Sequence, residues 1–321
     1  MAMKIRDAVM KLISIVVPTH NETENIAVLH ERIRSVFDGI FDYDFELIFV
    51  DDSSDHTPQV IKEQIQLDSR VKLIRLTRKF GQAVAICAGL EKSSGLAAII
   101  MDADLQDPPE SIPDLIAKWE NGFDVVYVKR PSESRSLLYS FGSTVFYKLL
   151  FRLSAVKIPA HVGEFRILDK RVVEILNTLT EKTRFLRGLT IWPGFKCCEV
   201  EIVRGERLAG ETNYNFSRSM QVAIDGIVSF SIAPLRLAIF LGFTLMVLSL
   251  LGASYALFLR LYTDTWASGW TLMFIAITLT GAINCLLLGV IGEYIGRIFL
   301  ESINRPLFVK DYEIGFPNDE E

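Results

Sequence analysis

Two long stretches without a charged residue most constrain what this chain can fold into. They span residues 237–259 and 265–292. Each is longer than the roughly 20 residues that an α-helix needs to cross a bilayer core of about 30 Å. The sequence therefore predicts two transmembrane helices within residues 232–300, joined by a short loop. Together they explain why half of the residues are hydrophobic, although residues 1–230 have the composition of an ordinary globular domain.

The charges around these runs predict their orientation. Arginines gather before the first run and basic residues follow the second, whereas the loop between them has only Arg260. The positive-inside rule then places both flanks in the cytoplasm. Four cysteines without disulfide or zinc spacing fit that reducing compartment. We expect a multi-pass protein of the inner (plasma) membrane, with residues 1–212 and the C-terminal tail, residues 301–321, on the cytoplasmic side.

Residues 213–231 lead into the first run and have most of their apolar side chains on one helical face. This pattern predicts an amphipathic helix in the membrane interface. The alternative is a helix packed on the globular domain. The same two interpretations apply to residues 136–154, which are rich in Leu, Phe and Tyr.

Residues 1–212 alternate between strand-like and helix-like segments. We expect strands at residues 12–19, 45–52, 71–77, 96–104 and 124–130, and helices at 24–37, 57–67 and 82–91. This alternation is typical of an α/β fold with a mostly parallel sheet and helices on both faces. Ligands of such sheets bind beyond the carboxyl ends of the strands.

The segment IIMDADLQDPPE places several oxygen ligands directly after one of these strands. Asp102 and Asp104 stand two residues apart, and Gln106 adds a neutral oxygen. Such close carboxylates repel each other unless a cation lies between them. Hard oxygen ligands suit Mg²⁺ or Mn²⁺, which share coordination with water and a substrate diphosphate. We predict a metal site at these three residues, and VDDSSDHT at another strand end supports it; the alternative is a solvated acidic turn.

Four motifs together resemble a known enzyme family. VVPTHNE, VDDSSDHT, MDADLQDPPE and RLAGETNY are similar to motifs of GT-A glycosyltransferases. More narrowly, the chain resembles polyprenyl-phosphate glycosyltransferases, the bacterial two-span relatives of dolichol-phosphate mannose synthase. GEYIGRIFLESINRPLF, at the end of the second apolar run and beyond it, matches the two-span members, which use undecaprenyl phosphate. The resemblance covers almost the whole chain and implies a GT-A catalytic domain at residues 1–212.

The resemblance implies metal-dependent transfer of a sugar from a nucleotide sugar to polyprenyl phosphate, with inversion, at the cytoplasmic membrane face. UDP-glucose and undecaprenyl phosphate are the favoured substrates. The implied nucleotide-sugar residues are Pro18, Thr19, Asn21, Glu22, Asp51 or Asp52, Arg78 and Asp102, and the implied catalytic residues are Asp104, Arg207 and Glu164. For Arg78, a plain surface position is the alternative.

One motif departs from the family pattern. The family often has Gly-Asp-Phe-Arg where this chain has GEFR, residues 163–166. Glu164 is one methylene longer than aspartate, so it either orients the sugar or only pairs with Arg166.

Basic residues after the fifth strand predict where the acceptor binds. Lys129, Arg130 and Arg135 stand between the metal motif and the apolar segment 136–154. The planar guanidinium group suits a phosphate because it can donate two hydrogen bonds. We expect these residues to bind the lipid phosphate. General attraction to anionic headgroups is the alternative.

Other functions compete with this interpretation. A donor such as GDP-mannose or a modified arabinose fits the same motifs. A processive polysaccharide synthase would have a Gln-x-x-Arg-Trp motif and more spans, and a non-catalytic membrane scaffold would not need the intact acidic triplet. A net charge of −5 gives no support for nucleic-acid binding. Small residues in the second run, such as Gly281 and Gly289, would permit a homo-oligomer.

Overall fold

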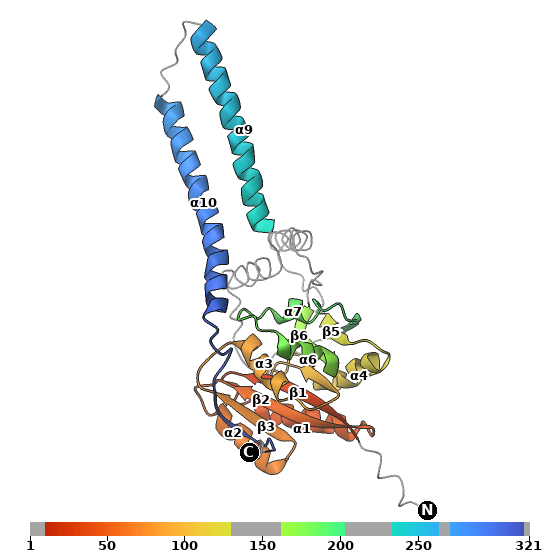
Figure 1. Ribbon diagram of the computed structural model, residues 1–321. Helices are drawn as coiled ribbons and strands as arrows, with labels where there is room; N and C mark the ends of the chain where they lie inside the picture. Colours follow the sequence, from red (N-terminus) through yellow and green to blue (C-terminus); the bar gives the residue numbers. More distant parts are fainter. Residues whose placement is uncertain (1–9, 130–161, 203–232, 263–269, 318–321) are drawn as a thin grey trace, which may run out of the picture. The chain divides into compact units, whose positions relative to one another are not determined.

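The computed structural model describes residues 10–129, 162–202, 233–262 and 270–317 (Figure 1). The contacts divide the chain into two compact units. One contains a β-sheet with its helices and the C-terminal strand, and the other contains two long apolar helices. The predicted interfacial helix at residues 213–231 and segment 136–154 lie outside the described residues.

An eight-stranded sheet is the centre of the first unit, in the order β7-β5-β6-β4-β1-β2-β3-β8. Its strands are β1 (Lys11–Thr19), β2 (Tyr43–Asp51), β3 (Val71–Leu76), β4 (Ala97–Ile100), β5 (Val125–Lys129), β6 (Val162–Asp169), β7 (Cys197–Glu201) and β8 (Lys310–Ile314). Strands β1 to β4 are parallel, whereas β6 runs antiparallel to β4 and β5, and β8 runs antiparallel to β3. The predicted α/β sheet is confirmed, and it is mixed because of these returning strands.

Helices cover both faces of the sheet. They are α1 (Ile26–Asp38), α2 (Thr57–Leu67), α3 (Gln82–Glu91), α4 (Ile112–Glu120), α6 (Lys170–Thr178) and the short α7 (Leu186–Leu189), with a 3₁₀ turn η1 (Pro109–Ser111) before α4. Alternate residues of β1, such as Ile13 and Ile15, belong to the core shared with α1, α2 and α4. The opposite face packs against α3 so closely that a Cβ at Gly89 would come within 2.3 Å of Val16 Cγ1. Only glycine permits this approach.

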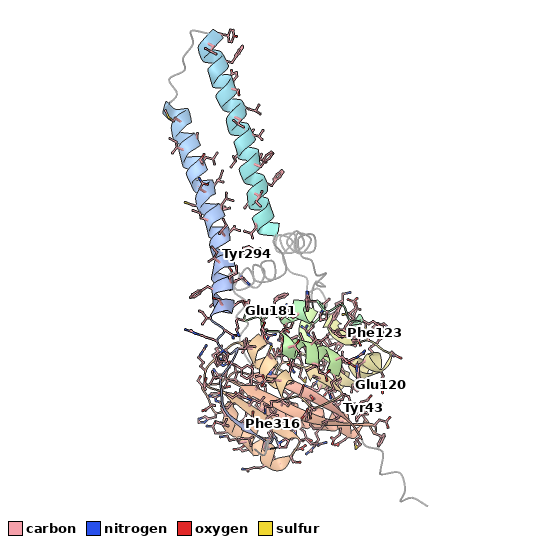
Figure 2. All side chains as sticks on the ribbon, in the orientation of Figure 1. Tyr43, Glu120, Phe123, Glu181, Tyr294 and Phe316 are labelled. Atoms are coloured by element: carbon pink, nitrogen blue, oxygen red, sulfur yellow. The ribbon has the colours of Figure 1, made fainter. Side chains whose placement is uncertain are left out.

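Helix α4 is tied to the sheet by a polar contact at its C-terminal end. Tyr43, at the start of β2, donates a 2.6 Å hydrogen bond to Glu120, and Figure 2 labels both residues. Burial and this contact with Glu120 raise the pKa of Tyr43, so its hydroxyl stays protonated and donates at neutral pH. The contact stabilises the end of the sheet opposite the acidic motifs.

The C-terminal strand completes the sheet. In β8, Tyr312 lies opposite Arg75 of β3, and Ile314 lies opposite Leu73. Lysines of the first unit lie over aromatic rings in and directly after β8: Lys62 Nζ is 4.5 Å from the Tyr312 ring centre, and Lys72 Nζ is 5.1 Å from that of Phe316. The tail predicted at residues 301–321 therefore joins the sheet of the first unit through residues 310–314.

The second unit contains α9 (Ala233–Tyr262) and α10 (Trp270–Ser302). Among the described residues, one stretch is long and apolar enough to cross a membrane, namely Leu279–Ser302 within α10. The apolar stretch Ala238–Gly252 in α9 is shorter. Large apolar side chains on both helices are exposed, including Phe243 at 61% and Leu288 at 67%. By this criterion, one of the two predicted spans is found.

Candidate active site

Three parallel strands bring the predicted motifs to one edge of the sheet. In the order β4-β1-β2, Thr19 lies opposite Asp51, and Val16 lies opposite Ile100. The loops after these strands therefore leave from the same edge. Strand β6 enters beside them, with Arg166 opposite Ile100. Since Glu164 precedes Arg166 by two residues and Asp102 follows Ile100 by two, both lie at this edge.

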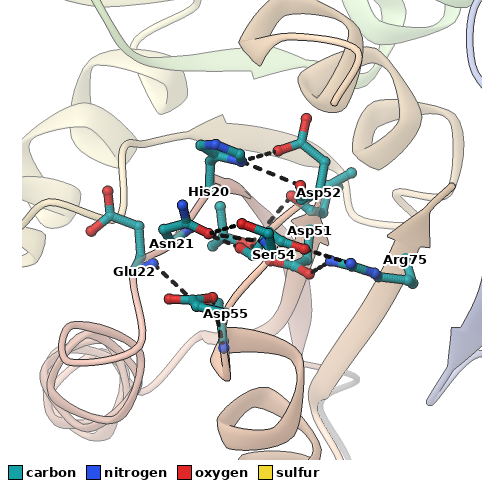
Figure 3. A network of polar contacts seen from close by, with 12 residues as sticks. His20, Asn21, Glu22, Asp51, Asp52, Ser54, Asp55 and Arg75 are labelled. Atoms are coloured by element: carbon teal, nitrogen blue, oxygen red, sulfur yellow. Dashed lines mark hydrogen bonds and ion pairs between the residues drawn. The ribbon is translucent and has the colours of Figure 1, made fainter. Parts of the chain in front are cut away.

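Asp51 is the centre of a buried polar network at the end of β2 (Figure 3). Its carboxylate accepts hydrogen bonds from the hydroxyls of Thr19 and Ser53 and pairs with the Arg75 guanidinium. The same arginine donates to the Ser53 carbonyl. Asp51 is fully buried. Its oxygens therefore serve to hold the ends of β1, β2 and β3 together.

Asp52 and His20 form a neighbouring pair. His20 Nδ1 lies 2.7 Å from Asp52 Oδ1, and the Phe80 N–H donates to Oδ2 at 3.2 Å. The Asp52 side chain is only 5% exposed, whereas that of His20 is 37% exposed. With Asp52 ionised, Nδ1 is the donating nitrogen, and His20 is the member of the pair that a ligand reaches more easily.

The loops after β1 and β2 are joined by backbone-to-side-chain hydrogen bonds. The Asn21 N–H donates to Ser53 Oγ at 2.8 Å, and the Ser54 N–H donates to Asn21 Oδ1 at 3.0 Å. Asn21 has a φ of 60°, a left-handed conformation that asparagine tolerates better than most residues. The Glu22 N–H donates to Thr57 Oγ1 at 3.0 Å. Asn21 and Glu22 therefore hold the loop after β1 against the loop after β2.

Asp55, in the loop after β2, also joins these two loops. Its carboxylate accepts hydrogen bonds from the Thr57 N–H and from the Thr23 hydroxyl. Burial raises the pKa of Asp55, but these hydrogen bonds outweigh burial and lower it below its usual value. Asp55 thus stays ionised, and it fixes the start of α2 against the loop after β1.

The acidic segment after β4 alternates strictly between buried and accessible residues. Met101, Ala103, Leu105 and Asp107 are buried, whereas Asp102, Asp104 and Gln106 are partly exposed. The three predicted metal ligands thus share the accessible side. Leu105 has a φ of 59°, a conformation that strains an ordinary side chain. Such strain occurs often at functional sites, where the surroundings fix an unfavourable backbone conformation.

Hydrogen bonds orient the carboxylates of this segment. Gln82, the first residue of α3, donates from Nε2 to Asp102 Oδ1 at 2.6 Å. The Gln106 N–H donates to Asp104 Oδ1 at 3.2 Å. Gln82 was not predicted from the sequence. The available signal was a polar residue directly after Gly81, at the start of the predicted helix 82–91.

The donor set fits a hard divalent cation. Two carboxylates and one amide oxygen on one accessible side match the few protein ligands that Mg²⁺ or Mn²⁺ takes when it also binds water and phosphate. In the described part of the chain, no three His, Cys, Asp or Glu side chains form a metal-binding group by themselves. A cation at this edge would therefore depend on the amide oxygen and on substrate oxygens.

Glu164 lies between two arginines. Its Oε1 accepts from Arg187 Nε at 2.7 Å, and its Oε2 accepts from the Arg166 guanidinium at 3.0 Å. Arg166 is 1% exposed and also donates to Thr190 and to the Gly163 carbonyl. The expected pairing with Arg166 is present. Arg187, from α7, was not anticipated, because nothing in the local sequence connects residues 23 positions apart.

The predicted basic residues have different surroundings. Lys129 pairs with Glu199 at 3.1 Å and with Glu201 at 3.4 Å, so two carboxylates already balance its charge. Arg78 is exposed and stacks over Phe80 at 3.9 Å. Pro18 lies within β1 opposite Val50. Arg130, Arg135 and Arg207 lie outside the described residues.

Comparisons with known proteins identify the family of this chain. The family described as Glycosyl transferase family 2 matches residues 14–176. YkcC of Bacillus subtilis, an uncharacterized glycosyltransferase, is 40% identical over 307 residues and covers 95% of both chains. The bactoprenol glucosyl transferase of Shigella phage SfV is 38% identical over 299 residues, which are 92% of this chain and 97% of that protein.

A mixed sheet with helices on both faces, in a chain with these matches, is that of a glycosyltransferase of the GT-A type. The chain belongs to glycosyl transferase family 2.

Proposed function

We propose that the protein transfers glucose from UDP-glucose to a polyprenyl phosphate, with undecaprenyl phosphate the favoured acceptor. The observation that supports this most is the accessible set of Asp102, Asp104 and Gln106 at the sheet edge. This set occurs in a chain that matches a bactoprenol glucosyl transferase over nearly its whole length. A donor such as GDP-mannose or a modified arabinose is the second candidate.

The nucleotide would bind where the loops after β1 and β2 meet. Thr19 and Asp51 anchor the strand ends, and Asn21 and Glu22 fix the loop beside them. In the neighbouring Asp52–His20 pair, the His20 side chain is 37% exposed and would be the member that meets the nucleotide. Arg78 stacks over Phe80, whose N–H donates to Asp52, and in our proposal it borders the nucleotide.

Asp102, Asp104 and Gln106 would hold Mg²⁺ or Mn²⁺. The cation, when bound, supplies positive charge for the diphosphate that leaves. Gln82 fixes the orientation of Asp102, so this carboxylate needs little rearrangement on binding. In our proposal Arg207 adds a second positive charge at the diphosphate.

In the reaction, an acceptor phosphate oxygen bonds to the anomeric carbon while the bond from that carbon to the nucleoside diphosphate breaks. The phosphate is already anionic near neutral pH, so no strong general base is required. A single displacement inverts the anomeric centre. Glu164, held by Arg166 and Arg187, would orient the sugar beside this line of attack. Arg130 and Arg135 would bind the acceptor phosphate, and the paired Lys129 would contribute less.

The sheet also supports the membrane topology that we propose. Strand β8 follows α10 in the chain, yet it is hydrogen-bonded to β3, which precedes α9. A hydrogen-bonded sheet cannot continue through a bilayer, so the chain between β7 and β8 crosses the membrane an even number of times. If α10 spans the membrane, a second crossing lies between β7 and β8, and in our proposal α9, with its apolar stretch Ala238–Gly252, is that crossing. The catalytic unit and the C-terminal tail would then both be cytoplasmic.

A donor screen tests the proposal. The purified full-length protein is incubated with undecaprenyl phosphate, Mg²⁺ or Mn²⁺, and either UDP-glucose, GDP-mannose or a nucleotide-linked modified arabinose. We expect a lipid product whose mass increases by one hexose with UDP-glucose. If a product forms only with another donor, the sugar of that donor replaces glucose in the proposal. Release of free sugar without a lipid product would contradict polyprenyl phosphate as the acceptor.

A further inference from the structure

A pocket of about 330 Å³ lies within the catalytic unit, and the active site described above does not use it. Its walls come from α3, from the end of α6 with the following loop, and from the segment that leads from α10 into β8. The charged residues in its lining are Glu91, Arg184 and Lys310, and its apolar walls include Leu176, Leu307 and Phe308. The pocket therefore has an excess of positive charge beside an apolar wall.

Arg184 is the central cation of this pocket. Its two terminal nitrogens donate to the carbonyls of Leu176 and Leu179 at the end of α6, at 3.4 Å and 2.5 Å. Each terminal nitrogen has a second N–H, and Nε is buried without a hydrogen-bond partner. Within the described chain, no carboxylate lies within ion-pair distance of Arg184, and burying an uncompensated charge costs free energy.

The other polar groups leave this charge excess in place. Lys310 Nζ lies 3.3 Å from Glu313 and 4.0 Å from Glu91. Lys92 also pairs with Glu313, at 3.0 Å, so with Arg184 three cations face two carboxylates. Burial raises the pKa of the Cys87 thiol to about 11, which keeps the thiol neutral. The side-chain amide of Asn177 donates to the Leu90 carbonyl at 3.3 Å. An anion is the ligand that these surroundings favour.

We propose that this pocket binds a phosphate group, with Arg184 and Lys310 as its cationic ligands. Phosphate suits the site because its oxygens can accept from both terminal nitrogens of one guanidinium group. A phospholipid headgroup and a free phosphate share this chemistry. The apolar wall of Leu307 and Phe308 favours the lipid.

The position of the wall in the chain also favours a lipid. It begins at Pro306, four positions after Ser302 ends α10, and four residues reach about 14 Å at most. If α10 spans the membrane, as the proposed function requires, only a short stretch of chain separates the membrane helix from this wall. This step rests on the proposed function, whereas phosphate binding itself does not.

Binding to the full-length protein in neutral-detergent micelles tests the site. The probes are dihexanoyl phosphatidic acid, inorganic phosphate and dihexanoyl phosphatidylcholine. Arg184→Gln and Lys310→Gln should each weaken binding of phosphatidic acid on the order of tenfold, the effect of losing one charge-assisted hydrogen bond. Arg184→Lys keeps the positive charge and should weaken binding of phosphatidic acid less than Arg184→Gln does. Arg34→Gln, which removes an exposed arginine of α1 that pairs with Glu31, is the matched control and should have no effect.

Each outcome decides the proposal. Tighter binding of phosphatidic acid than of inorganic phosphate identifies a lipid headgroup site, and equal binding identifies a free phosphate site. Binding that is the same in the parent protein, in Lys310→Gln and in Arg184→Lys overturns the proposal, even if Arg184→Gln fails to fold. Sugar transfer to polyprenyl phosphate is measured on the same samples. If transfer is absent while phosphatidic acid binds, the proposed function fails and the phosphate site stands.

Discussion

Gln82 and Asp102 are joined by a 2.6 Å hydrogen bond from the side-chain amide to a carboxylate oxygen. Gln82 begins α3, and Asp102 follows β4, so the bond connects a helix on one face of the sheet to the acidic edge. The amide holds one oxygen of Asp102 in a fixed direction. We infer that Gln82 prepares Asp102 for its ligand before the substrate binds.

Replacing Gln82 with alanine should lower kcat/KM for the nucleotide sugar by about tenfold, because a hydrogen bond to a charged group stabilises by about 1.5–3 kcal/mol. Gln82→Glu should be worse, since it places a second carboxylate against Asp102. The measurement is steady-state transfer at several Mn²⁺ concentrations. Gln66→Ala, at an exposed position of α2, is the control. Full activity of Gln82→Glu would show that Asp102 does not depend on this contact.

Asp104→Asn should reduce transfer on the order of 100-fold or more while the protein stays folded, because charge stabilisation at the departing diphosphate is lost. Asp38→Asn removes an exposed carboxylate at the end of α1 and should leave turnover unchanged. Nucleoside diphosphate release is followed with Mg²⁺ and with Mn²⁺. A monodisperse Asp104→Asn protein with near-normal turnover would mean that the metal assignment is wrong.

Arg187→Ala should lower kcat more than it raises KM for the nucleotide sugar, because Arg187 acts through Glu164 and not on the nucleotide. Arg187→Lys keeps the charge and should recover part of the loss. The control is Arg171→Ala, whose side chain is 68% exposed and pairs with Asp124 and Asp169. Equal changes in kcat for the alanine and lysine variants would contradict a positioning role that depends on charge.

The sequence predicted the parallel half of the sheet well, because strands of β-branched residues alternate there with helices of clear periodicity. The helices at residues 57–67 and 82–91 have the predicted bounds. The strand expected at residues 96–104 ends at Ile100, because the acidic segment turns through the left-handed Leu105. Strand β8 was not predicted, since pairing with β3 across more than 200 residues leaves no local pattern.

For the candidate site too, local sequence patterns were predictive and contacts between distant elements were not. Residues in contiguous motifs, such as Asp102, Asp104 and Gln106, were found because their spacing alone brings them together. Their supports were missed, because Gln82, Arg75 and Arg187 come from other elements and meet the motif only in the folded chain. Sequence reasoning also treated Asp51 and Asp52 as alternatives, whereas the fold buries Asp51 completely and pairs Asp52 with the partly exposed His20.

Acid should weaken one defined contact in the turn between α2 and β3, the pair of Asp68 and Arg70. The hydrogen bonds from Arg70 outweigh burial and hold the pKa of Asp68 well below its usual range. Because the folded pKa is depressed, the stabilisation is complete above the unfolded value of about 3.9 and is lost as the pH falls towards the folded pKa. Asp68→Asn should therefore cost on the order of 1.5 kcal/mol at pH 7 and less at pH 3.

Thermal unfolding of both proteins in neutral detergent at pH 7 and pH 3 measures this difference. Asp38→Asn again serves as the control, because Asp38 is exposed. A penalty for Asp68→Asn that is equal at both pH values would mean that the carboxylate charge does not contribute.

The pairing of β8 with β3 makes the topology testable. We expect that residues between α9 and α10 face away from the cytoplasm, because the strands before α9 and after α10 share one sheet. In a chain whose four native cysteines are replaced, Tyr262→Cys should react with an impermeant thiol reagent in intact cells. Pro317→Cys, at an exposed position after β8, should react only after the cells are opened. Labelling of both positions in intact cells, or of neither, would mean that α9 and α10 do not cross the membrane as a pair.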